Sequence, residues 1–389
     1  MRQRFIQSFP TSQDIQSALD NKELGKPYVA LSREEPSIDW NSKEINYAGM
    51  YFTIEALEDG NLTVSKSCQY SINKGEWISI TSSATISVSN GDKVRFKDGL
   101  KQRKDYMFSG NTIMSNVYGN VMSLMYGDNF VGQTTTLLID GLFRHYTGLK
   151  DAGNLILPAT TLAGFCYNSM FLDCTSLATA PSILPAATLA TNCYASMFQG
   201  CTSLTKAPEL PATTLADYCY NSMFKGCTSL TTAPELPAAT LASRCYRFMF
   251  QGCTSLTKAP ELPVTSLADY CYNSMFKGCT SLTTAPELPA TTLAAGCYSD
   301  MFASCDALTT APELPATVLV NNCYNSMFSW SRNLKYIKCL ATDISATNCT
   351  GSWLLFASHS GTFVKHPDAT WTTGYDGIPN GWTIENAEI

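Results

Sequence analysis

The chain has 389 residues, of which 15% are charged and 45% hydrophobic, and its formal net charge is −6. This length allows two or three modules with sizeable cores, and the negative balance argues against a nucleic-acid-binding protein, which needs a basic face. No run of about 18 consecutive apolar residues occurs, so we expect no membrane span.

Residues 1–45 are polar and irregular, with three prolines, and are typical of an attachment arm. A merely frayed terminus is the alternative. The first residues lack the apolar stretch of roughly 7–15 residues that a signal peptide needs. We therefore expect either a protein that is not exported by that route or one whose signal has been removed.

Residues 46–100 alternate apolar and polar positions in short runs separated by Gly, Asn and Asp, which is typical of strands and tight turns. They predict a small all-β domain, either a β-sandwich or a barrel.

Residues 101–150 are rich in Met, and Leu142–Leu149 is a degraded copy of a sequence that recurs further on. Because the first face of a repeat array needs a cover, we expect 101–150 to be an N-terminal cap.

Residues 151–330 consist of units that recur every 26 residues, with one step of 27. Each unit contains a Cys-Tyr pair, at Cys166, Cys193, Cys219, Cys245, Cys271, Cys297 and Cys323. Such a period predicts a solenoid.

Within a unit, Leu215, Cys219, Met223 and Cys227 follow one another at a spacing of four, which predicts a helix, and Gly226 suits its end. The prolines of the following return segment leave room only for a short parallel strand. The expected fold is thus an α/β solenoid with short parallel strands and helices, preceded by the all-β domain. Residues 331–389, in which large aromatics replace the small residues of the units, are expected to form the C-terminal cap.

Thirteen of the sixteen cysteines lie at repeat positions, as two sets eight residues apart. Two cysteines eight apart on one helix are about 12 Å apart, too far for a disulfide. We expect reduced thiols in the core, with disulfides between units as the alternative. No CxxC occurs and the three histidines are scattered, so neither a metal site nor a cofactor is expected.

Three sets of residues are candidates for binding. A glutamate recurs in the return segments, as Glu209, Glu235, Glu261, Glu287 and Glu313, here named the acidic row. It is interpreted either as a cation-bridged or sugar-hydroxyl-binding ladder or as solvated carboxylates. Arg244, Arg247 and Phe248 break the pattern of their unit, as an interface hot spot or by ordinary drift. The recurring tyrosines are expected to pack half-buried, with stacking on sugars as the alternative.

The chain contains no GxSxG, HExxH, P-loop or dinucleotide fingerprint. A hydrolase needs two carboxylates in different environments across a cleft, whereas the acidic row offers equivalent ones. We therefore expect a protein without enzymatic activity and name no catalytic residue.

The pattern Phe-x-x-Cys-Thr-Ser-Leu with a later proline, as in Phe224–Leu230 and Pro237, resembles the leucine-rich repeats of the Bacteroides surface protein A-like family. The likeness covers about 150–360, with a longer unit and an extra proline in the strand. The flanking segments Tyr51–Gly60 and Gly361–Pro367 are similar to segments of Bacteroides surface proteins and of virion proteins from crAss-like gut phages. The resemblance implies attachment to a cell surface.

Taken with the resemblance, these features predict a non-enzymatic virion protein of a phage, a tail or head fibre. Residues 1–100 would bind other virion proteins, and the solenoid would bind a glycan or protein of the host surface. By analogy with fibres the expected oligomer is a homotrimer. One alternative is a bacterial cell-surface adhesin with leucine-rich repeats, and another is a capsule depolymerase.

Overall fold

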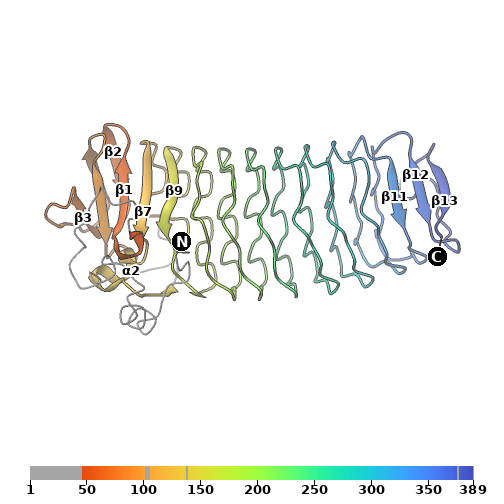
Figure 1. The fold of residues 1–389 in the computed structure, drawn as a ribbon, viewed down its shortest axis with the longest axis horizontal. Helices are drawn as coiled ribbons and strands as arrows, with labels where there is room; N and C mark the ends of the chain where they lie inside the picture. The colour runs from red at the N-terminus through yellow and green to blue at the C-terminus, as the bar shows by residue number, and fades with distance from the viewer. Residues whose placement is uncertain (1–45, 101–105, 137–138, 375, 389) are drawn as a thin grey trace, which may run out of the picture.

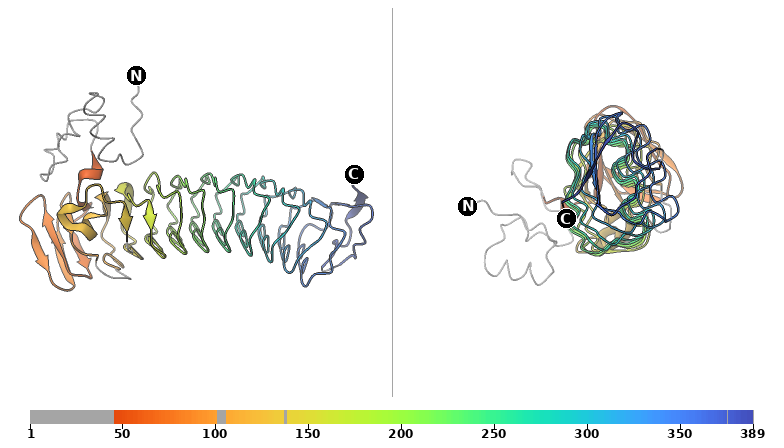
Figure 2. Two further views of the ribbon diagram at one scale, coloured as in Figure 1. Left: turned by 90° about the horizontal axis from the view of Figure 1, so that it is seen from below. Right: turned by 90° about the vertical axis from the view of Figure 1, so that its right-hand side faces the viewer.

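The computed structural model describes residues 46–388 except 101–105, 137–138 and 375. The expected attachment arm, residues 1–45, lies outside the described residues. The described part is a long rod, in which a β-sheet occupies one end and the 26-residue units follow one another along the axis (Figure 1). Seen end-on, successive units lie over one another (Figure 2).

An open six-stranded sheet forms the N-terminal end of the rod. Its order is β4-β3-β6-β1-β7-β9, and a separate pair is formed by β2 and β5. The strands are β1 (Phe52–Ala56), β2 (Gly60–Val64), β3 (Cys68–Ile72), β4 (Ile78–Ile80), β5 (Ala84–Val88), β6 (Lys93–Lys97), β7 (Ser115–Asn120) and β9 (Leu149–Ile156). The sheet does not close, so the barrel expected as one alternative for 46–100 is wrong.

The sheet continues beyond residue 100 into the repeats. Its first strands pair antiparallel, but β7 pairs parallel with β9. The outer edge of β9 then forms a parallel bridge from Asp151 to Thr179, in the first units. Since parallel pairing at this edge is what the units need, the sheet serves as the template on which the array begins.

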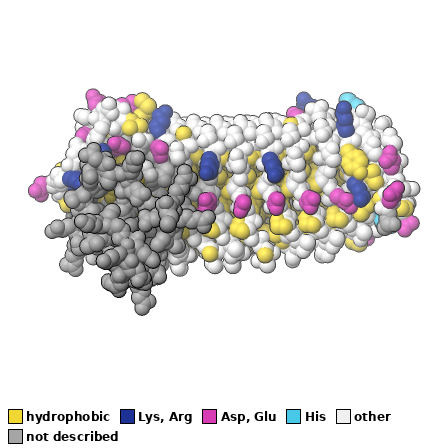
Figure 3. Space-filling model, viewed as in Figure 1, with side chains coloured by type: hydrophobic (Ala, Val, Ile, Leu, Met, Phe, Trp, Pro, Cys, Tyr) yellow, Lys and Arg dark blue, Asp and Glu magenta, His cyan; other side chains and the backbone are white. Residues whose placement is uncertain are grey.

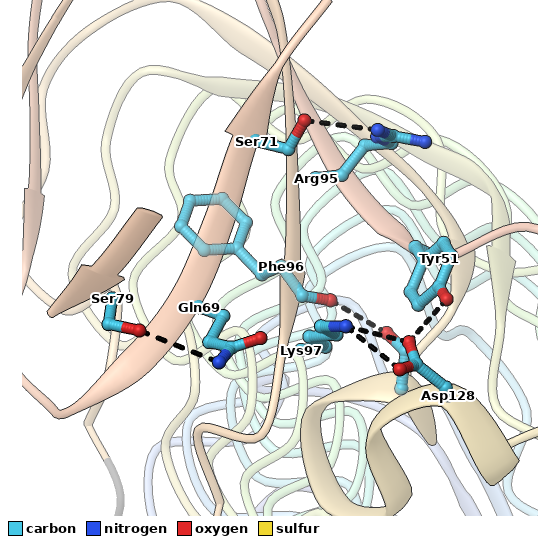
Figure 4. A network of polar contacts seen from close by, with 9 residues as sticks. Tyr51, Gln69, Ser71, Ser79, Arg95, Phe96, Lys97 and Asp128 are labelled. Atoms are coloured by element: carbon cyan, nitrogen blue, oxygen red, sulfur yellow. Dashed lines mark hydrogen bonds and ion pairs between the residues drawn. The ribbon is translucent and has the colours of Figure 1, made fainter. Parts of the chain in front are cut away.

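Short elements accompany the sheet. η2 (Tyr47–Gly49) precedes β1 and contacts β7 and β9, and α2 (Ser123–Tyr126), which follows β7, contacts β6 and leads into η3 (Gly127–Asn129). Further along, the strands β8 (Thr135–Thr136) and β10 (Thr161–Leu162) pair with each other. Lys97 on β6 is nearly buried and donates to both carboxylate oxygens of Asp128, at 2.8 and 2.9 Å (Figure 4). The Tyr51 hydroxyl donates to the same carboxylate at 2.6 Å. Partial burial alone would raise the pKa of Asp128, but these donors outweigh it and hold the pKa below its ordinary value.

The helix expected in each unit is wrong. From 163 to 335 no residue is helical. Instead, a turn segment such as Ala216–Cys227 is a run of overlapping turns. The amide of Cys219 donates to Ala216 O in the same unit at 3.2 Å, whereas the next amide, of Tyr220, donates to Cys245 O in the following unit at 3.0 Å.

Left-handed backbone conformations explain why the turn segment is not a helix. Tyr218, Ser222 and Gly226 have φ of +58°, +56° and +74°. A right-handed helix needs negative φ at every residue, so a positive value at every fourth residue turns the chain each time. Apolar residues spaced by four then lie on one side of a series of turns, just as they would lie on one side of a helix.

The return segments pair only through isolated parallel bridges. Lys206 bridges to Thr232, and Lys258 bridges to Thr284. Pro234 and Pro237 have no amide hydrogen for a longer ladder, so the expected short parallel strands are reduced to single residues. At the C-terminal end the pairing becomes regular again, in a parallel sheet of β11 (Tyr336–Cys339), β12 (Thr362–Lys365) and β13 (Thr383–Asn386).

Stacked aromatic rings fill the interior of the array. The phenylalanines from Phe143 to Phe328 stack at centroid distances of 5.2–5.7 Å. The tyrosines from Tyr167 to Tyr324 form a second column at 5.8–6.2 Å, which ends on Trp353. All sixteen cysteines are buried, as expected of core thiols, and none of them forms a disulfide in the described structure.

Candidate binding surface

The acidic row lies on the outside of the return segments. All five glutamates are exposed, whereas the leucine that follows each one is buried, as Leu210 and Leu236 show. The alternation follows from extended backbone, in which neighbouring side chains point to opposite sides. In Figure 3 a row of acidic side chains runs along the rod, with basic side chains beside it.

Open hollows lie between the return segments of successive units. One of about 590 Å³ is lined by Thr231–Pro237, Thr257–Glu261 and Pro263. Equivalent hollows of about 510 and 420 Å³ lie one unit before and one unit after it. Because the prolines leave the segments bridged at single residues, the surface between them stays indented. The repeat thus creates a series of similar sites, each bordered by two glutamates of the acidic row.

Basic residues border the same hollows. Lys206 and Lys258 line them, each three positions before a glutamate. At the C-terminal end, Glu313 forms an ion pair with Lys338 at 3.0 Å. The carboxylates of the row that line the three hollows are those of Glu209, Glu235, Glu261 and Glu287.

Arg244, Arg247 and Phe248, which break the pattern of their unit, lie on a turn segment and line none of these three hollows. The Arg244 guanidinium lies between the rings of Tyr218 and Tyr270, at 5.3 and 4.9 Å. Arg247 donates from Nε to Asn273 Oδ1 at 2.9 Å and lies 4.3 Å from the Phe248 ring. These half-buried contacts stabilise the turn segment from within. The hot-spot hypothesis for Arg244, Arg247 and Phe248 stays a prediction.

The tyrosine column is closed to ligands. Tyr167 and the six that follow it are at most 2% exposed. The rings therefore pack as expected but are fully buried and not half-buried, and stacking on sugars is excluded. Burial raises the pKa of Tyr220 well above its ordinary value, because the ionised ring would lose its water. These rings hold the array together and take no part in a surface site.

The sequence did not predict two exposed aromatic side chains, Trp330 and Phe356. Trp330 and Phe356 are 44% and 57% exposed, and their ring centroids are 4.3 Å apart. They stand 26 residues apart, at the position where Gly226 and Gly252 stand in earlier units. Aligning the units on these glycines, and not only on Cys, Tyr and Glu, would have found the pair.

Within the described ranges no three His, Cys, Asp or Glu side chains form a group suited to a metal ion. The same residues contain no helix long and apolar enough to cross a membrane.

No family model, no curated protein and no solved structure matches the chain. A function can therefore be proposed only from the described geometry. This is a long rod with a filled interior and an outer face on which acidic side chains and hollows recur in successive units.

Proposed function

We propose that this chain is a non-enzymatic virion protein of a phage, a tail or head fibre, that binds a glycan of the host cell surface. In this proposal the array is a solenoid of the leucine-rich-repeat type, in which turn segments take the place of helices. The observation that carries the binding function is the series of open hollows bordered by the acidic row. The resemblance of the units and their flanks to surface and virion proteins supports the location.

The chemistry of the hollows suits a chain of sugars. Carboxylate oxygens accept hydrogen bonds from hydroxyls, and hydrogen bonds to a charged partner are stronger than neutral ones. Threonine hydroxyls and the Lys206 and Lys258 ammonium groups line the same hollows and add donors. A periodic polymer can place equivalent hydroxyls in successive hollows, and such multiple contacts raise the overall affinity.

The test is binding of the purified protein to an array of capsular and other bacterial surface glycans. The variant Glu235→Gln, Glu261→Gln, Glu287→Gln should lose about tenfold or more in affinity. A matched variant with the exposed glutamates Glu76, Glu385 and Glu388 changed to Gln has the same net charge and should bind as the unchanged protein does. Equal binding by both variants would refute the role of the acidic row.

A bacterial surface adhesin remains the second candidate, because the repeat motif resembles that of surface proteins. Immunogold labelling of purified virions with an antibody to the array separates the two. Label on the particles supports the fibre, and unlabelled particles refute it. A third candidate, a capsule depolymerase, requires release of reducing sugar from capsule by the purified protein, and we expect none.

A further inference from the structure

Trp330 and Phe356 are the most exposed of the large aromatic side chains among the described residues. Their rings are tilted by 43° to each other and lie side by side on consecutive units. Most other large aromatics of the array are buried in its two columns. An adjacent pair of outward rings is therefore a departure from the pattern of the array.

The backbone under both rings is strained. Trp330 and Phe356 have φ of +65° and +58°, and the corresponding Gly200, Gly226, Gly252 and Gly278 have φ of +74° to +76°. Glycine adopts this left-handed conformation freely, whereas a bulky side chain does not. Because both rings remain exposed, burial gives little compensation for the strain. The left-handed conformation also occurs at other bulky residues of the array, such as Tyr218 and Phe248, but those side chains are half-buried. What distinguishes Trp330 and Phe356 is therefore that two neighbouring rings at such positions both face outward.

The surroundings of the pair favour a sugar over a protein partner. The Arg332 guanidinium lies 5.6 Å from the Trp330 ring, and Arg332 and Asn333 are exposed. His359 and Ser360, which follow Phe356, are also exposed. The core of a protein interface is a continuous apolar area, whereas a pyranose has one apolar face of C–H groups, about the size of an aromatic ring, and a rim of hydroxyls.

We propose that Trp330 and Phe356 form a stacking subsite for a pyranose ring of a surface glycan, with Arg332 donating hydrogen bonds to its hydroxyls. The inference rests on the proposed function in that the ligand is a glycan. It concerns a different site, because none of the three hollows along the acidic row is lined by these residues.

The decisive variant is Trp330→Gly, Phe356→Gly, which restores the residue found at this position in four other units. Affinity for pyranose polysaccharides (dextran, mannan, xylan and capsule) should fall about tenfold or more. The midpoint of urea unfolding should be no lower than in the unchanged protein, since glycine relieves the left-handed strain. The conservative variant Trp330→Tyr keeps a ring at this position and should retain binding.

Unchanged binding by the double glycine variant overturns the subsite, and so does lost binding with a lower unfolding midpoint, which marks the rings as structural. If only the triple Glu→Gln variant loses binding, the acidic row stands and this subsite fails. If only the glycine variant loses binding, the reverse holds. If the unchanged protein binds no polysaccharide, or if the rings bind a host protein instead, the sugar assignment is refuted.

Discussion

The second cysteine of each unit satisfies a backbone carbonyl inside the array. Cys227 Sγ donates to Phe198 O in the preceding unit at 3.1 Å, and Cys253 makes the same contact with Phe224 O. Ser331, which stands where a further cysteine would be, donates to Phe302 O at 2.8 Å. The position therefore requires a small side chain with one donor, buried without water, and cysteine meets this with little polar surface.

The pair Cys227→Ser and Cys227→Ala tests this requirement. The serine should cost less than about 1 kcal/mol of unfolding free energy, because it repeats the contact of Ser331. The alanine should cost about 1–2 kcal/mol, because it removes the donor and leaves a small void. Urea unfolding of the two variants measures the difference. If serine destabilises as much as alanine, the S–H contact is not what the position needs.

The turn segment depends on its neighbours to a degree that a helix would not. Alternate amides donate outside the unit, as those of Ser222 to Arg247 O and of Phe224 to Met249 O do. A helix satisfies its interior amides by itself, whereas a single turn segment leaves every second one without a partner. The segment is therefore stable only within the stack, which explains why the end units need β9 on one side and β11 to β13 on the other.

Gly226 tests whether the left-handed positions govern this element. A Cβ at Gly226 would meet nothing closer than 3.9 Å, so Gly226→Ala introduces no clash. Only the conformation is penalised, and we expect a loss of about 1 kcal/mol. Ser304→Gly, at the same position of another unit with φ of +59°, should gain a similar amount. Urea midpoints that move in the opposite directions would contradict the assigned backbone.

Much of the fold could be predicted from the period alone, and the part that failed has a specific cause. The repeat, the buried cysteines, the outward glutamates and the short, proline-limited strands all followed from residue spacing. The helix did not, because apolar residues spaced by four fit both a helix and overlapping turns. Gly226 was interpreted as a helix end, although it is only the last of three left-handed positions in its unit. The other two, Tyr218 and Ser222, carry no sequence signal.

At the scale of the whole molecule, one hydrophobic core extends from the N-terminal sheet to the last strands. Phe143 begins the phenylalanine column and also contacts Phe52 and Phe108 of the sheet region, both at 5.8 Å. At the other end, Trp353 stacks between Tyr324 and Trp371. Because the columns are continuous, every unit transmits its packing to the next.

This shared core predicts a steep loss of stability in alkali. Burial raises the pKa of the Cys193 and Cys271 thiols to about 12, from an ordinary value near 9, and it also raises the pKa of the Cys227, Cys253 and Cys279 thiols. Below pH 9 the thiols are protonated in both states and the full stability is present. As the pH rises from 9 toward 12, the unfolded chain loses these protons while the folded chain keeps them, so stability falls. Each such thiol contributes about 1.4 kcal/mol per pH unit.

Urea unfolding under reducing conditions at several values between pH 8 and pH 11 measures this slope. The variant Cys227→Ser, Cys253→Ser, Cys279→Ser removes three titrating groups and keeps a donor at each position. Its unfolding free energy should fall less steeply, by about 4 kcal/mol per pH unit at high pH. A slope equal to that of the unchanged protein would mean that these thiols are open to water in the folded array, and thus that the units do not share a sealed core.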